Sequence, residues 1–122
     1  ARMGTGGTPT YGTGASDYIH TRSTGVTTSF AAAGATDSKI VMQGATIGNA
    51  STNYFNGELI IVDPANTSHH KAIRHESFSF SSGGTYYTQG TGRYVNTAAV
   101  TAIRLLLNSG NIASGTFVLS GK

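Results

Sequence analysis

The sequence predicts an all-β protein, folded as a jelly-roll-like antiparallel β-sandwich. Among its 122 residues 17 are glycines, 38% are hydrophobic and only 11% are charged. The apolar residues fall into short runs separated by clusters of Gly, Asn, Ser and Pro, as in all-β domains rich in turns. No run has a convincing helical period, since the alanines at 31–33 are followed at once by Gly34. The length fits one domain with a modest core.

The first 15 residues differ in composition from the rest. They are rich in Gly and Thr, contain one Pro and have little apolar content. This composition is typical of linkers. We therefore expect a flexible, extended N-terminal arm over residues 1–15 and a β-sandwich domain over residues 16–122.

Two strands are expected before residue 50. The first covers residues 27–33 with Phe30 as its apolar anchor, and the second covers residues 39–47 with Ile40 and Met42. Both runs are short and end near glycines, which favour turns.

The next strand is expected over residues 54–62. It ends in the continuous apolar run 59–62, which predicts a strand covered on both faces because an alternating pattern is missing. Pro64 closes the segment, since proline cannot continue a ladder of backbone hydrogen bonds.

Residues 69–80 show the clearest alternation in the chain. Ile73 alternates with Arg74, and the spacing of Phe78 and Phe80 places both rings on one face of a strand. We expect a half-buried strand here.

Two shorter strands are expected to follow, at residues 85–88 and 93–97. The glycines of segment 90–92 predict a turn between them.

The end of the sequence predicts two further strands. Residues 99–107 are rich in β-formers, residues 108–111 form a Gly/Asn turn, and residues 112–119 carry Phe117 and Leu119 on one face. We expect this last strand to close a sheet, which brings the total to about eight strands.

Composition argues against several function classes. The chain has no Cys, so thiol chemistry and cysteine metal sites are excluded. The eight Lys and Arg residues are scattered rather than gathered into a stripe, so we expect no nucleic-acid partner. The longest apolar run, 59–62, is too short to span a bilayer, and we expect no membrane insertion. The GxG pairs of residues 1–15 lack the strand and helix of a phosphate-binding loop, so we expect no cofactor.

The four histidines predict no metal site. His69, His70 and His75 lie within seven residues of each other, and His20 stands alone. Along one strand, His69 and His75 would be roughly 20 Å apart, too far to share an ion. Three copies of one His around a trimer axis could bind a metal, but surface or interface histidines are the favoured interpretation.

The carboxylates give no enzymatic signature. A glycosidase needs two carboxyl groups a few ångströms apart, and no pair stands out among the five candidates Asp17, Asp37, Glu58, Asp63 and Glu76. The sequence also lacks the G-x-S-x-G nucleophile motif. We expect no catalytic residues.

Tyrosines near the turns offer the best binding candidates. Exposed Tyr beside Gln and Arg suits sugar binding, because the ring covers an apolar sugar face while polar neighbours bond hydroxyls. The alternative is that some of these rings pack in the core or a subunit interface. The candidate ligand-binding residues are Tyr86, Tyr87, Gln89, Arg93 and Tyr94.

The second half of the chain resembles the C-terminal domain of bacteriophage tail fibre, tail spike and tail needle knob proteins. The matching motifs are NGELII at 56–61, DPANT at 63–67, GRY at 92–94, AAVTAIR at 98–104 and SGNIASGTFVLSG at 109–121. The family commonly ends this last motif with Leu-Tyr-Gly, whereas this chain has Ser120 in place of the aromatic residue.

The resemblance implies a homotrimeric virion protein of the phage tail, which acts outside the cell, and it supplies no catalytic residues. We expect the domain to be non-enzymatic. Its partner would be a bacterial surface polysaccharide or lipopolysaccharide contacted during host attachment. A structural capping or capsid-decoration domain without ligand binding is the alternative. The motif residues look like fold determinants, so the resemblance assigns no binding residue.

Overall fold

The computed structural model describes residues 1–26, 29–44, 46–48, 50–81 and 83–121, and the side chains of residues 26–31 lie outside this description. Within these ranges the protein has eight strands and no helix. The strands form two antiparallel sheets, one of five strands and one of three. The expected all-β fold class is therefore confirmed.

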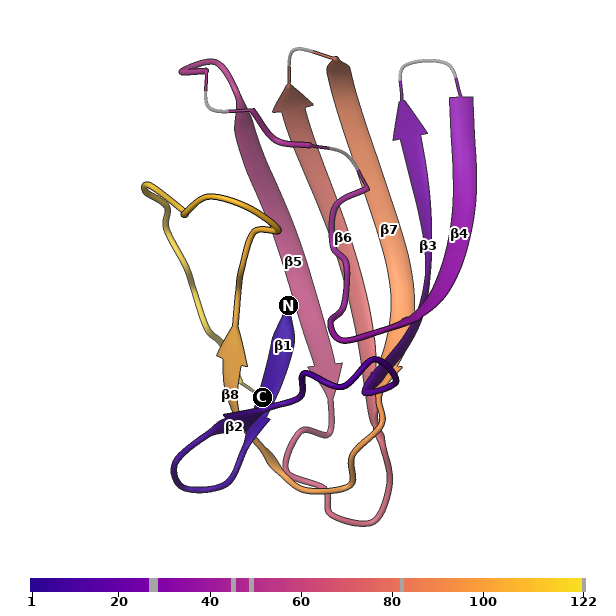
Figure 1. Cartoon of the computed structure of the whole chain (residues 1–122), viewed down its shortest axis with the longest axis vertical. Coiled ribbons are helices and arrows are strands. Elements are labelled where there is room, and N and C mark those ends of the chain that lie inside the picture. Colours follow the sequence, from indigo (N-terminus) through magenta and orange to yellow (C-terminus); the bar gives the residue numbers. More distant parts are fainter. Residues whose placement is uncertain (27–28, 45, 49, 82, 122) are drawn as a thin grey trace.

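The larger sheet has the order β4-β3-β7-β6-β5, and every neighbouring pair is antiparallel (Figure 1). Two hairpins, β3-β4 and β6-β7, contribute four of its strands, and the long segment 38–53 carries the chain from β4 at one edge to β5 at the other. Its strands are β3 (Tyr18–Val26), β4 (Ser29–Asp37), β5 (Tyr54–Val62), β6 (Lys71–Ser81) and β7 (Gly84–Tyr94).

The smaller sheet has the order β2-β1-β8 and corrects the expectation of an N-terminal arm. Residues 1–15 contribute β1 (Arg2–Thr5) and β2 (Thr10–Tyr11), and β1 pairs with β8 (Val100–Arg104). Met3 is completely buried. A single large apolar side chain and a strand partner almost 100 residues away anchor this Gly/Thr-rich segment, and composition alone does not reveal either.

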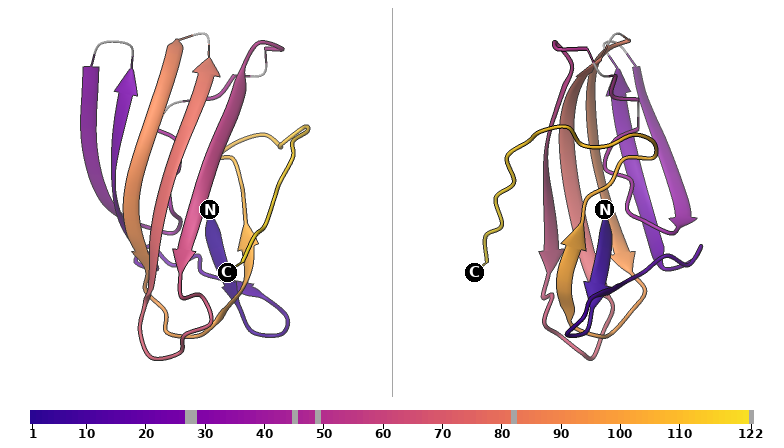
Figure 2. Two further views of the ribbon diagram at one scale, coloured as in Figure 1. Left: turned by 180° about the vertical axis from the view of Figure 1, so that it is seen from behind. Right: turned by 60° about the vertical axis from the view of Figure 1, so that its left-hand side comes forward.

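The core lies where the smaller sheet packs against one face of the larger sheet (Figure 2). We call this the inner face and its opposite the outer face. Tyr18 and Tyr94 belong to this core, and their rings stack with centroids 5.0 Å apart. The buried apolar residues are Ala1, Met3, Tyr18, Ile40, Ile73 and Tyr94.

Segment 38–53 crosses the inner face without forming a strand in its described residues, so the strand expected at 39–47 is wrong. Ile40 is nevertheless buried, and its backbone exchanges hydrogen bonds with Ala1, at 2.9 Å for the Ile40 nitrogen and 2.6 Å for the Ile40 oxygen. Further along, the Ser77 hydroxyl donates to the Met42 carbonyl at 2.6 Å. Polar bonds from the sheet hold this segment, and hydrophobic pattern alone does not signal them.

Gln43 shows how polar this part of the inner face is. Its side-chain amide donates to the Ser79 hydroxyl, and its carbonyl oxygen accepts a bond from the Thr88 hydroxyl at 3.1 Å. Because Ser79 and Thr88 are buried, these bonds satisfy groups that would otherwise be costly to remove from water.

β6 confirms the alternation expected from the sequence. Ile73 is buried and Arg74 is exposed, and Phe78 and Phe80 share the outer face. Their rings meet edge to face with centroids 5.0 Å apart.

β7 runs unbroken through residues 90–92, so the turn expected there is wrong. Its glycines serve close packing instead. A Cβ on Gly90 would lie 2.5 Å from the Thr21 carbonyl oxygen, and one on Gly92 would lie 2.8 Å from the Ile19 carbonyl oxygen. The glycines let β3 and the inner-face side chains approach β7 closely.

β5 contradicts the expectation of a strand covered on both faces. It also lies at an edge of the larger sheet. Leu59 and Ile61 are only half-buried against the core, and Val62 is 54% exposed.

No strand was expected at β3, since its alternating residues are mostly polar. The strand expected at 27–33 falls partly outside the described residues, at 27–28. Its remaining residues lie in β4, and the expected Phe30 anchor is among the side chains outside the description.

The closing strand expected at 112–119 is not formed. β8 ends at Arg104, and described residues 105–121 belong to no strand. Phe117 and Leu119, expected on one buried face, are 63% and 87% exposed.

Candidate functional site

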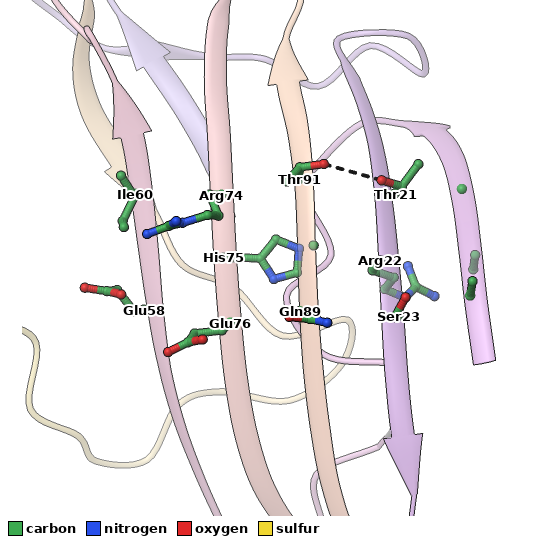
Figure 3. A pocket seen from close by; sticks show the side chains of 14 residues that line it. Thr21, Arg22, Ser23, Glu58, Ile60, Arg74, His75, Glu76, Gln89 and Thr91 are labelled. Atoms are coloured by element: carbon green, nitrogen blue, oxygen red, sulfur yellow. Dashed lines mark hydrogen bonds between the residues drawn. The ribbon is translucent and has the colours of Figure 1, made fainter. Parts of the chain in front are cut away.

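The outer face of the larger sheet carries a hollow of about 600 Å³, whose lining side chains are drawn in Figure 3. All five strands of the larger sheet contribute to its lining. Most of the lining side chains from β3, β5, β6 and β7 are polar, because the opposite faces of these strands are turned to the core. The principal lining residues are Thr21, Ser23, Glu58, Ile60, Arg74, Glu76, Gln89 and Thr91.

The register of the strands brings these residues into two rows across the sheet. One row runs from Glu58 through Glu76 and Gln89 to Ser23, and each member is directly opposite the next. Side chains directly opposite on one face of an antiparallel sheet are in contact range. The row therefore presents two carboxylates, an amide and a hydroxyl along one line.

The second row lies one pleat away and runs from Ile60 through Arg74 and Thr91 to Thr21. The Thr21 and Thr91 hydroxyls are 3.5 Å apart and share a weak hydrogen bond. Among the described residues no ion pair joins Arg74 to Glu58 or Glu76. These charged groups are thus available to hydrogen-bond a molecule in the hollow.

Tyr87 stands at the edge of this hollow, next to Gln89 on the same strand. Its hydroxyl lies 3.3 Å from a Glu76 carboxylate oxygen and 3.5 Å from the Gln89 amide oxygen, and it can donate to either. The loss of water around the phenol, followed by the negative charge of Glu76, raises the pKa of Tyr87. The hydroxyl is therefore protonated at neutral pH and acts as a donor.

Further aromatic rings lie next to Tyr87 on the outer face. Phe78 is directly opposite Tyr87, and Tyr54 is directly opposite Phe80 with ring centroids 4.8 Å apart. Tyr54, Phe78 and Tyr87 are all exposed. An apolar ring surface beside a row of hydrogen-bonding groups is the combination that binds sugars, which have apolar faces and hydroxyl edges.

The structure separates the five residues predicted from the sequence. Tyr87 and Gln89 belong to the outer-face site. Arg93 is exposed on the same face but lies four residues beyond Gln89 along β7, opposite Ala72 and Ile19.

Tyr86 and Tyr94 point to the inner face. Tyr86 is half-buried, and Tyr94 is 3% exposed and stacked on Tyr18. Neither ring can cover a ligand on the outer face. For Tyr94, the structure supports the alternative of packing in the core.

Sequence reasoning missed Glu58, Arg74, Glu76 and the two threonines as members of one site. The alternation in β6 signals that Arg74 and Glu76 share a face. Nothing in the sequence, however, reveals which residues of β3, β5 and β7 lie opposite them.

Two histidines lie in the interior rather than on the surface. His20 and His75 are each 2% exposed, and none of their four ring nitrogens has a hydrogen-bond partner. Burial, followed by the positive charge that His20 could carry, lowers the pKa of His75 to about 4. Burial, with Arg22 nearby, also lowers the pKa of His20. Both rings are therefore neutral at pH 7.

No metal centre is formed by the side chains of the described residues, in which no three His, Cys, Asp or Glu residues are grouped to hold an ion. In the same part of the chain, no helix is long and apolar enough to cross a membrane. Comparisons with protein-family models, with curated proteins and with solved structures returned no match.

Proposed function

We propose that the outer-face hollow binds a bacterial surface polysaccharide or lipopolysaccharide. In this proposal the chain is a homotrimeric, jelly-roll-like attachment domain of a bacteriophage tail, without enzymatic activity. The observation that carries the binding proposal is the row Glu58-Glu76-Gln89-Ser23 beside the exposed rings of Tyr87 and Phe78. The phage assignment is supported by the resemblance of residues 56–121 to tail proteins.

Each part of this surface matches a part of a sugar. The Tyr87 ring offers an apolar platform, and carboxylate and amide oxygens accept hydrogen bonds from sugar hydroxyls. The Arg74 guanidinium donates to ring oxygens or to acidic groups of a polysaccharide. A single shallow site of this kind binds weakly. Three copies on one trimer would engage a repeating polymer together, so that avidity compensates for low affinity.

The first experiment is a glycan array probed with the intact chain, followed by titration of the best oligosaccharide. We expect Tyr87→Ala to weaken binding about tenfold, which corresponds to ~1.4 kcal/mol and is in line with the loss of one aromatic contact. Gln89→Ala should also weaken binding. The matched control is Tyr11→Ala, because Tyr11 lies on β2 in the smaller sheet.

Binding that is unchanged in both outer-face variants would overturn the assignment of the site. A trimer that binds no bacterial glycan would support the alternative of a structural capping or capsid-decoration domain. Mass spectrometry of the oligosaccharide after incubation should recover it intact, and a cleaved product would contradict the non-enzymatic assignment.

A further inference from the structure

Residues 112–120, which we call the tail segment, have the sequence of a strand but no sheet to join. Ile112, Thr116, Phe117 and Val118 favour β-strands, and Leu119 adds a further large apolar side chain. Val118 and Leu119 are 86% and 87% exposed, and the right-hand view of Figure 2 shows the segment standing clear of both sheets. Consecutive large apolar side chains left in water forgo the hydrophobic free energy of burial.

The larger sheet has an edge at β5 to which a further strand could be added. β5 occupies the edge of the sheet over nine residues, the same length as the tail segment, and most of its residues are exposed. Natural edge strands are usually protected by charged residues such as Lys, by Pro, by bulges or by a covering segment. Without such protection, their free backbone N–H and C=O groups can pair with a strand of another chain. β5 contains neither Lys nor Pro, its one charged residue is Glu58 on the outer face, and it pairs with β6 without a break in register.

The side chains of the two segments are complementary as well. On its inner face β5 presents Leu59 and Ile61, both half-buried, next to which the sheet stops. Phe117 and Leu119 alternate in the same way, so both can extend this apolar face when the tail segment is added as a strand. Residues 105–121 contain no charge that would oppose the pairing.

We propose that the tail segment of one copy pairs as an added strand with the β5 edge of a second copy. Main-chain hydrogen bonds supply the affinity and the buried Phe117 and Leu119 supply the register, as in other cases of strand addition. Because donor and acceptor are different surfaces, the contact is head-to-tail, and it closes into a ring when each copy is rotated by one third of a turn. This inference rests on the trimer of the proposed function and names the segment that builds it.

The test compares the intact chain with Val118→Pro, measured by light scattering and by amide hydrogen exchange over a range of concentrations. Proline at 118 removes a backbone donor and breaks an added strand. Val118 lies outside both sheets, so the variant leaves the described fold intact, and circular dichroism verifies this. The matched control is Ser109→Pro, which places the same residue in the segment that precedes the tail.

We expect a trimer for the intact chain and for Ser109→Pro, and a monomer for Val118→Pro. Amides of residues 112–120 and of β5 should become protected together as the concentration rises, and Val118→Pro should abolish both protections. Protection that does not depend on concentration, in a monomer, would mean that the tail closes on its own chain and would overturn the proposal.

A trimer with an unprotected tail would also overturn it, while leaving the trimer of the proposed function in place. Glycan binding is measured separately on Val118→Pro. If the Val118→Pro monomer still binds sugar weakly through Tyr87, the glycan site works without the strand exchange. The two proposals can therefore fail independently of each other.

Discussion

Acidification should destabilise the fold through the buried histidines. His20 and His75 have no hydrogen-bond partners. Burial lowers their pKa values most, and the nearby Arg22 and N-terminal amine of Ala1 both act in the same direction. At His20, Asp37 acts to raise the pKa and Lys39 to lower it. In the unfolded chain each imidazole takes up a proton near pH 6.5. In the folded protein His75 does so only at about pH 4. Between these two values the unfolded state binds more protons, so the free energy of unfolding falls as the pH falls.

The magnitude follows from the size of the shift. A shift of His75 from 6.5 to about 4 corresponds to about 3 kcal/mol, lost progressively as the pH is lowered from 6.5 to 4. This is a large share of the ~5–15 kcal/mol that stabilises a typical domain. The lowered pKa of His20 adds to the loss in the same direction.

Urea denaturation at closely spaced pH values, followed by circular dichroism, measures this effect. His75→Leu removes one titrating group without leaving a cavity, and it should flatten the pH dependence between 6.5 and 4 and raise the stability at the acidic end. His69→Gln is the control, since the His69 side chain is 59% exposed beside Asp63. A free energy of unfolding that stays constant over this range, or the same slope in His75→Leu, would refute the reasoning.

Two further substitutions test the packing of the larger sheet. Gly90→Ala should lower the free energy of unfolding by about 1–3 kcal/mol, because its Cβ would meet the Thr21 carbonyl oxygen. Gly34→Ala is its control and should change thermal stability little, because its Cβ would make only ordinary contacts. Tyr94→Ala should cost about 3–5 kcal/mol by opening a cavity in the core, and Tyr54→Ala on the exposed outer face should cost far less in the same denaturation assay. Equal losses within either pair would contradict the assigned packing.

Local pattern predicted much of β5 and β6 correctly. β5 has the bounds 54–62 that the sequence indicates, and the alternation of Ile73 with Arg74 describes the two faces of β6. These features depend on the pleat of a single strand, in which successive side chains point to opposite sides.

In two glycine-rich segments the local pattern predicted the wrong structure. Residues 90–92 look like a turn, and residues 1–15 look like a linker. In the structure, Gly90 and Gly92 lie inside β7 and Met3 anchors β1. Glycine permits both a turn and the close approach of a neighbouring strand, and only the neighbour decides between them.

The binding candidates divided for a related reason. The sequence brought Tyr86, Tyr87, Gln89 and Tyr94 to attention by composition. The pleat of β7 sends Tyr87 and Gln89 to the outer face and Tyr86 and Tyr94 to the inner one. Alternation could have made this division, had residues 84–94 been read as a single strand.

By itself, the sequence determined the all-β class, the bounds of β5, the two faces of β6, and the aromatic and amide groups of the candidate site. The tertiary structure decided which strands are neighbours, and thereby placed Glu58 opposite Glu76, buried His20 and His75, and left the tail segment without a partner. The physical reason is that residue order sets the direction of each side chain along a strand. The pairing of strands, by contrast, is a long-range choice set by packing and register across the whole sheet.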